Sequence, residues 1–123
     1  MSMGIAVLVV ELPWPDKDLS PNARVHWARK AKKVRLARWT AFGRVAFGGE
    51  GALKVPAPNG LSVAYTFHPA TKRRRDLDNL IASTKAYTDG LAQALAVDDS
   101  TFRLSYRMGE LRRPAQVIVE ISS

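Results

Sequence analysis

The pattern of apolar and polar residues predicts four β-strands. Residues 4–12 are β-branched and apolar, which is typical of a strand that is covered on at least one face. Residues 61–67 alternate between apolar and polar side chains, as in a half-buried strand. Residues 101–107 and 115–121 fit two further strands, joined by a turn near Gly109. These segments are expected to form one small sheet.

Helical spacing of apolar residues predicts two main helices. Ser20 and Pro21 suit the N-cap and the first position of a helix over about residues 22–45. The apolar residues that recur at helical spacing in this segment are Val34, Ala37, Ala41 and Val45. A second helix is predicted over residues 77–94. The side chains that share one of its faces are Leu80, Thr84, Tyr87, Leu91 and Leu95.

The length of the chain and the order of these elements predict a single domain. At 123 residues the chain is too short for two ordinary domains, and 46% of its residues are apolar, which suffices for a core. The order β-α-β-α-β-β indicates a compact α/β or α+β domain over residues 1–123, with two main helices against a small mixed sheet.

Residue types that the chain lacks exclude several kinds of site. There is no cysteine, which excludes disulfides and the common thiolate zinc sites and favours a cytosolic location. With only His26 and His68, a histidine-rich metal cage is excluded too. No apolar run reaches the roughly 18 residues of a membrane span. The apolar start also lacks the early positive charge of a signal peptide, so none is expected.

The charge balance indicates a polyanionic partner. Lys and Arg number 19 and Asp and Glu 11, which gives a formal charge of +8. Between Arg24 and Arg44 there are basic residues but no acidic one. Nucleic acid is the simplest partner for so basic a small domain. An anionic membrane surface is less favoured, because the basic residues do not form one polar face opposite a face of Trp and Leu.

The segment richest in candidate chemistry is Lys72-Arg73-Arg74-Arg75-Asp76-Leu77-Asp78-Asn79. In extended backbone, residues i and i+2 point the same way, so Asp76 and Asp78 can aim both carboxylates at one hard cation, Mg²⁺ or Mn²⁺. The four cations that precede them can hold phosphates beside that ion. The alternative is that Asp76 caps a helix and Asp78 lies in its first turn. Spacing alone does not separate these two interpretations.

Two further residues are candidates for this site, and one of them, Asp99, joins it only if the chain folds back on itself. Asp99 meets the first acidic pair if its loop returns to the same sheet edge, whereas an Asx-type turn is the simpler interpretation of its Asp-Asp-Ser sequence. Lys85 follows Asp78 by almost two helical turns and so shares its face, where a cation can steady a phosphate. The alternative, favoured by the residues alone, is a surface lysine paired with Asp89 at i+4.

The order of these motifs resembles the RusA family of Holliday-junction resolvases. The match rests on Arg75-Asp76-Leu77-Asp78-Asn79, then Lys85 with Asp89-Gly90-Leu91, then Asp98-Asp99. The opening Leu12-Pro13-Trp14-Pro15 is similar to the start of that family, and residues 19–27 (LSPNARVHW) resemble a variant found among phage-type members. The resemblance spans about residues 5–121, and its specificity comes from the combination of motifs.

The resemblance implies a homodimeric, Mg²⁺-dependent endonuclease that resolves four-way DNA junctions by paired symmetric nicks, in a bacterial cytoplasm or encoded by a phage or prophage. The residues that match the family's metal-binding carboxylates are Asp76, Asp78 and Asp99. The family's catalytic lysine maps to Lys85. In the best-known form of the motif this lysine follows the Asn by three residues, a position that Ala82 occupies here; Lys85 lies about one helical turn further on.

Binding to DNA is expected to come from the basic residues. The candidates next to the acidic site are Lys72, Arg73, Arg74 and Arg75. The candidates along the first helix are Arg29, Lys30, Lys32, Lys33, Arg35 and Arg38. Three other interpretations stay open. The first is a non-catalytic DNA- or RNA-binding domain, in which the acids are caps and turns, and the second is a nuclease of the same fold that acts on other branched DNA. The third, less favoured, is a catalytically impaired structural relative, since the lysine is shifted.

Overall fold

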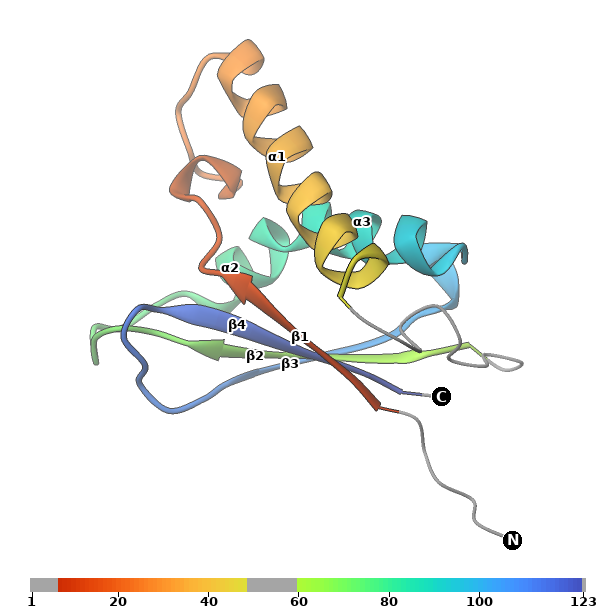
Figure 1. Cartoon of the computed structure of the whole chain (residues 1–123). Helices are drawn as coiled ribbons and strands as arrows, with labels where there is room; N and C mark the ends of the chain where they lie inside the picture. Colours follow the sequence, from red (N-terminus) through yellow and green to blue (C-terminus); the bar gives the residue numbers. More distant parts are fainter. Residues whose placement is uncertain (1–6, 49–59, 123) are drawn as a thin grey trace, which may run out of the picture.

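Four strands form one mixed sheet (Figure 1). The computed structural model describes residues 7–48 and 60–122, so the first residues of the strand expected over 4–12 lie outside the described part. The strands are β1 (Val7–Pro13), β2 (Ser62–His68), β3 (Arg103–Met108) and β4 (Gln116–Ser122), in the spatial order β1-β4-β2-β3. β4 runs antiparallel to both of its neighbours, and β3 runs parallel to β2. The predicted mixed sheet is confirmed.

The last two strands are joined by a short connection but are not neighbours in the sheet, because β2 lies between them. β4 takes a central place, where Val117, Val119 and Ile121 are completely buried. β3 forms an edge and reaches its parallel position beside β2 through a helical crossover, as parallel pairs require. Gly109, at the start of the connection, passes so close to β2 that a Cβ there would lie 2.6 Å from the His68 ring.

Three helices cover one face of the sheet (Figure 1). They are α1 (Trp27–Ala46), α2 (Leu77–Ser83) and α3 (Lys85–Leu95). The residues that α1 buries are Ala37, Ala41 and Val45, while Val34, predicted to share their stripe, is exposed. Within the described residues, no helix is both long enough and apolar enough to cross a membrane. The chain therefore folds as a small mixed α+β domain, as predicted.

The first helix begins later than its sequence predicts. Ser20 and Pro21 start a turn in which the Ala23 N–H donates to the Ser20 carbonyl at 3.0 Å. Proline suits the second position of such a turn as well as the start of a helix. A single 3-10 turn, η1 (Lys17–Leu19), precedes it, and the N-cap of α1 is His26, whose Nδ1 accepts from the Ala28 N–H at 3.2 Å.

The second predicted helix is two helices, divided at Thr84. The Thr84 hydroxyl donates to the Ile81 carbonyl and the Ser83 hydroxyl to the Asn79 carbonyl, both at 2.7 Å. Hydroxyl groups that bond back to helix carbonyls compete with the regular helical ladder and favour a bend or a break. The prediction of one continuous helix over 77–94 was wrong at this point, because apolar spacing does not report such competition.

The core lies between the sheet and the pair α1 and α3. Gly90 allows the two helices to meet, since a Cβ at this position would lie 2.2 Å from the Arg38 carbonyl oxygen. The Tyr65 hydroxyl, buried under the helices, shares a 2.6 Å hydrogen bond with the Thr88 hydroxyl and so ties β2 to α3. Of the candidate site residues, Lys85 begins α3, whereas Asp76 and Asp78 lie at the start of α2.

Candidate functional site

Asp76 is the N-cap of α2. Its Oδ1 accepts hydrogen bonds from the backbone N–H groups of Asp78, at 2.9 Å, and Asn79, at 3.4 Å. These bonds satisfy amide groups that a helix leaves unpaired at its start, and Asp78 lies exposed in the first turn, where the helix dipole favours negative charge. The capping interpretation is therefore confirmed. The two residues do not have the fully extended backbone on which the paired-carboxylate geometry was predicted.

The basic run before α2 lines a hollow of about 270 Å³, which we call the arginine hollow. Among the residues that line it are Trp14, Lys17, Arg73, Arg74, Arg75 and Asp76. Arg75 has a structural role in its wall: it donates to the Thr71 and Arg73 carbonyls at 2.9 and 2.7 Å, and its guanidinium carbon lies 5.5 Å from the centre of the Trp14 ring.

Arg73 and Arg74 differ from Arg75 in having no side-chain partner. Both are exposed, and no hydrogen bond or ion pair joins either side chain to another of the described residues. Together with Lys17 they leave positive charge at the mouth of the arginine hollow. Unpaired guanidinium groups around a concavity suit a bound phosphate, with which arginine forms bidentate hydrogen bonds.

Lys85 joins α3 to the loop that follows it. Its Nζ donates to Asp89 Oδ1 at 2.7 Å and to Asp99 Oδ2 at 2.8 Å. Asp99 begins a short 3-10 turn, η2 (Asp99–Thr101), whose N-cap is Asp98. The predicted i+4 pair with Asp89 is confirmed, and so is the capped turn at Asp98. The fold thus brings Asp99 back to α3, but it brings it to Lys85.

The contact between Lys85 and Asp99 shifts the pKa of both groups. The hydrogen bonds that Lys85 donates, first to Asp89 and then to Asp99, raise the pKa of its ammonium group above the ordinary value. The bond from Lys85 in turn holds the pKa of the Asp99 carboxyl below its ordinary value. Lys85 is therefore protonated at neutral pH, so it can donate hydrogen bonds and neutralise negative charge.

The three predicted carboxylates do not form one ligand group. Across residues 7–48 and 60–122, no three Asp, Glu or His side chains are placed so that they could hold a metal ion together. One Asp76 oxygen is engaged by the backbone of α2, and one Asp99 oxygen by Lys85. In this arrangement the residues do not fit a metal centre made of Asp76, Asp78 and Asp99, and the Mg²⁺ or Mn²⁺ site stays a prediction.

The structure divides the predicted DNA-binding residues of α1 into two groups. Arg29 Nε donates to the buried carboxylate of Asp18 at 2.8 Å, and Lys33 Nζ donates to Asp16 at 2.9 Å. These two cations hold η1 against α1. The other predicted α1 cations, Lys30, Lys32, Arg35 and Arg38, make no ion pair with any described residue.

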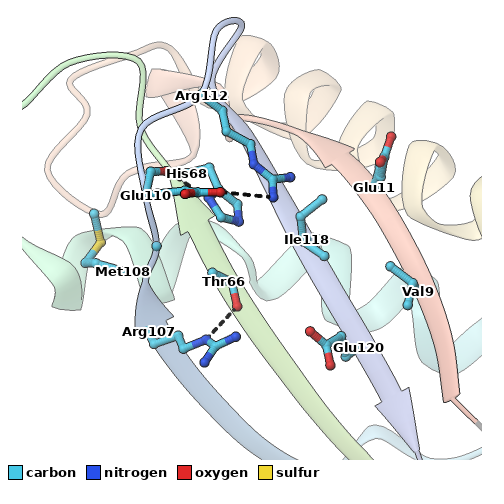
Figure 2. A pocket seen from close by; sticks show the side chains of 11 residues that line it. Val9, Glu11, Thr66, His68, Arg107, Met108, Glu110, Arg112, Ile118 and Glu120 are labelled. Atoms are coloured by element: carbon cyan, nitrogen blue, oxygen red, sulfur yellow. Dashed lines mark hydrogen bonds and ion pairs between the residues drawn. The ribbon is translucent and has the colours of Figure 1, made fainter.

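A larger hollow, of about 550 Å³, lies on the sheet face opposite the helices (Figure 2). Its arginines are engaged: Arg107 Nε donates to the Thr66 hydroxyl at 3.0 Å, and Arg112 pairs with Glu110 at 3.6 Å. Glu11 and Glu120 also line this hollow, so its three glutamates outnumber its two arginines. The arginine hollow, where cations are in excess, is therefore the stronger candidate for an anionic substrate.

Some residues of the site were not predicted. Trp14 and Lys17 line the arginine hollow, and Asp16 and Asp18 take up two cations of α1. The available signal was the Asp-Lys-Asp sequence just after the Pro-Trp-Pro segment, three charged residues in a segment that breaks regular structure. Only the fold shows that this segment lies between α1 and α2.

No family model matches the chain. The chain is 42% identical over 113 residues to a protein of Xylella fastidiosa (strain Temecula1 / ATCC 700964) that is described as an uncharacterized protein. The match covers 90% of this chain and 73% of the relative. The chain therefore belongs to the same family as the Xylella protein, whose description names no activity.

Proposed function

We propose that the protein is a DNA endonuclease of the Holliday-junction resolvase type, acting on branched DNA in the cytoplasm. The observation that carries this proposal is the contact between Lys85 and Asp99. The resemblance to the RusA family rests on a segment that begins at Asp76 and includes Lys85, and on the later Asp-Asp pair. The contact brings these two motifs together in space. A protonated lysine beside an exposed carboxylate is an arrangement suited to phosphate chemistry.

The arginine hollow would supply the binding of phosphate. Arg73 and Arg74 are unpaired within the described residues and flank the start of α2. The side chain of Lys85 is 67% exposed, so a phosphate oxygen can reach its ammonium group and replace a carboxylate as hydrogen-bond acceptor. Such an exchange would free Asp99 only when substrate is bound.

The proposal includes a divalent cation and a homodimer, both on the grounds of the resemblance. The cation would be Mg²⁺, with Mn²⁺ as a substitute; the described carboxylates do not converge on a site for it. A dimer has a physical rationale, since a four-way junction has approximate twofold symmetry and paired nicks need two sites. Sedimentation velocity at micromolar concentration tests the dimer directly.

Cleavage of a labelled four-way junction tests the activity. Linear duplex and flap DNA serve as comparison substrates, each with Mg²⁺, Mn²⁺ or EDTA. We expect symmetric nicks in the junction that EDTA and Asp78→Asn both abolish. Glu120→Gln is the matched control, because Glu120 is an exposed acid on the opposite sheet face. Cleavage of linear duplex at the same rate, or cleavage that survives in Asp78→Asn, would overturn the proposal.

The second candidate function is a branched-DNA-binding domain without nuclease activity. Asp76 favours it, because its carboxylate is engaged as a helix cap, and the described acids make no three-residue ligand group. Junction binding without cleavage in any of the three conditions would support this function. Binding that Arg73→Gln and Arg74→Gln weaken would still assign the arginine hollow to DNA.

A further inference from the structure

The face of α1 that points away from the core carries both cations and exposed apolar side chains. Its residues, which we call the outer face of α1, are Lys32, Arg35, Leu36 and Trp39. Lys32 precedes Arg35 and Leu36 by three and four residues, and Trp39 follows them by four and three, which is the spacing that places side chains on one side of a helix. The opposite side buries Ala37 and Ala41. In Figure 1, the N-terminal half of α1 extends beyond the layer formed by α2 and α3.

The cations of the outer face differ from the paired cations of the same helix. Arg29 forms an ion pair with Asp18, and Lys33 forms one with Asp16. Lys32 and Arg35 have no ion pair or side-chain hydrogen bond to any described residue. No acidic residue occurs between Arg24 and Arg44, so the outer face has no carboxylate of its own helix to neutralise it.

Two large apolar side chains accompany these cations. Leu36 is 60% exposed and Trp39 is 56% exposed. The Trp39 ring packs edge-to-face with Phe42, with ring centres 5.4 Å apart and an angle of 86° between the planes. This contact restrains the ring on the helix and still leaves more than half of the residue open to a ligand.

We propose that the outer face of α1 binds unpaired nucleotides at the branch point of DNA, with Trp39 stacking on a base and Lys32 and Arg35 contacting the adjacent phosphates. This inference rests on the proposed function, because it assigns a part of the branched substrate to a second surface. Single-stranded DNA is held by aromatic side chains that stack on bases and by flanking cations. Intact duplex offers phosphates to the cations but hides the faces of its bases from Trp39.

A second copy of the chain fits this surface less well. In a twofold contact the same patch meets itself, which would bring Lys32 and Arg35 of one protomer close to the same cations of its partner. No carboxylate on the outer face offsets that repulsion. Charge complementarity therefore favours a polyanion over a second copy.

Titration with fluorescein-labelled oligo-dT and with a four-way junction, both in EDTA, tests the inference. We expect Trp39→Leu to weaken oligo-dT binding roughly five-fold or more, because stacking on a base is lost. Trp27→Leu is the matched control, since Trp27 is 76% exposed on the same helix but outside the outer face. This variant should bind oligo-dT with the affinity of the wild type. The double variant Lys32→Gln with Arg35→Gln should bind oligo-dT with a weaker salt dependence. The slope of log K against log[salt] should become shallower by about 0.7 for each phosphate contact that is lost.

The possible failures are distinguishable. Equal affinity of Trp39→Leu and wild type for oligo-dT would overturn the inference, and junction binding by both would leave the proposed function standing. Failure of the wild type to bind either DNA would overturn both. A change of oligomeric state in Trp39→Leu without a change in DNA affinity would assign the outer face to a second copy and overturn the inference.

Discussion

Lys85 Nζ lies 2.8 Å from Asp99 Oδ2 and 2.7 Å from Asp89 Oδ1, so one ammonium group joins α3 to the turn that follows it. This contact places the later Asp-Asp pair against the start of α3, the second helix after the arginine-rich segment. It also raises the pKa of Lys85 and lowers the pKa of Asp99, which makes the contact open to a direct test.

Lys85→Met should raise the pKa of Asp99 toward its ordinary value of about 3.9. The reason is that Lys85 is the first cause of the lowered pKa of the Asp99 carboxyl. Carboxyl-detected NMR titration measures the change, with Lys32→Met as a control that removes an unpaired cation elsewhere. An Asp99 pKa that is equal in Lys85→Met and wild type would show that the contact is not populated in solution.

The same contact predicts a pH dependence of stability. Because the pKa of Asp99 is lower in the folded state, the contribution of the pair is present above the ordinary pKa and is lost as the pH falls through the lowered value. Urea unfolding at a series of pH values should therefore show a gap in the free energy of unfolding between wild type and Lys85→Met at neutral pH. This difference should disappear in acid. The gap should be small, since solvent screens so exposed a pair.

Asp76→Ala should lower the free energy of unfolding by about 1 kcal/mol, because the N-cap of α2 loses its acceptor. Asp76→Asn keeps an oxygen acceptor and should retain most of the stability, but it removes the negative charge. Thermal unfolding and junction cleavage, measured on both variants, separate the two roles. Cleavage by Asp76→Asn at the wild-type rate would mean that Asp76 acts only as a cap.

Gly90→Ala should destabilise the domain by about 1–3 kcal/mol, because its Cβ would lie 2.2 Å from the Arg38 carbonyl oxygen and the helices would have to separate. Gly43→Ala is the matched control. Gly43 also lies in a helix, but the nearest atom to its Cβ would be Phe47 Cδ2 at 3.9 Å. We expect that control to be neutral or to stabilise by about 0.5–1 kcal/mol. Similar unfolding midpoints for the two variants would contradict the close packing of α1 and α3.

Arg29→Ala and Lys32→Ala should differ in what they affect: the first should lower stability, and the second should weaken DNA binding. Arg29→Ala leaves the buried Asp18 carboxylate without its partner and should destabilise by about 1–3 kcal/mol. Lys32→Ala removes an exposed, unpaired cation, so stability should stay within about 0.5 kcal/mol while DNA binding weakens. Chemical unfolding and a junction titration on each variant are the measurements. Loss of stability in Lys32→Ala alone would reverse this assignment.

The sequence by itself determined the class of fold. Strand segments were readable because half-buried strands alternate and buried strands are continuously apolar, and both patterns are local. The buried stripe of α1 was readable for the same reason at Ala37, Ala41 and Val45. The sequence also identified Asp76 as a helix cap among its alternatives and Asp89 as the i+4 partner of Lys85, since capping and i+4 pairs depend on a few consecutive residues.

Only the tertiary structure decided what distant segments do together. The place of β4 between β1 and β2 depends on pairing with two strands that lie far from it in the sequence. The return of Asp99 to Lys85, and the pairing of Arg29 with Asp18, join residues across 14 and 11 positions of sequence. Such contacts are decided by chain geometry and by competition among charges, which no local pattern records.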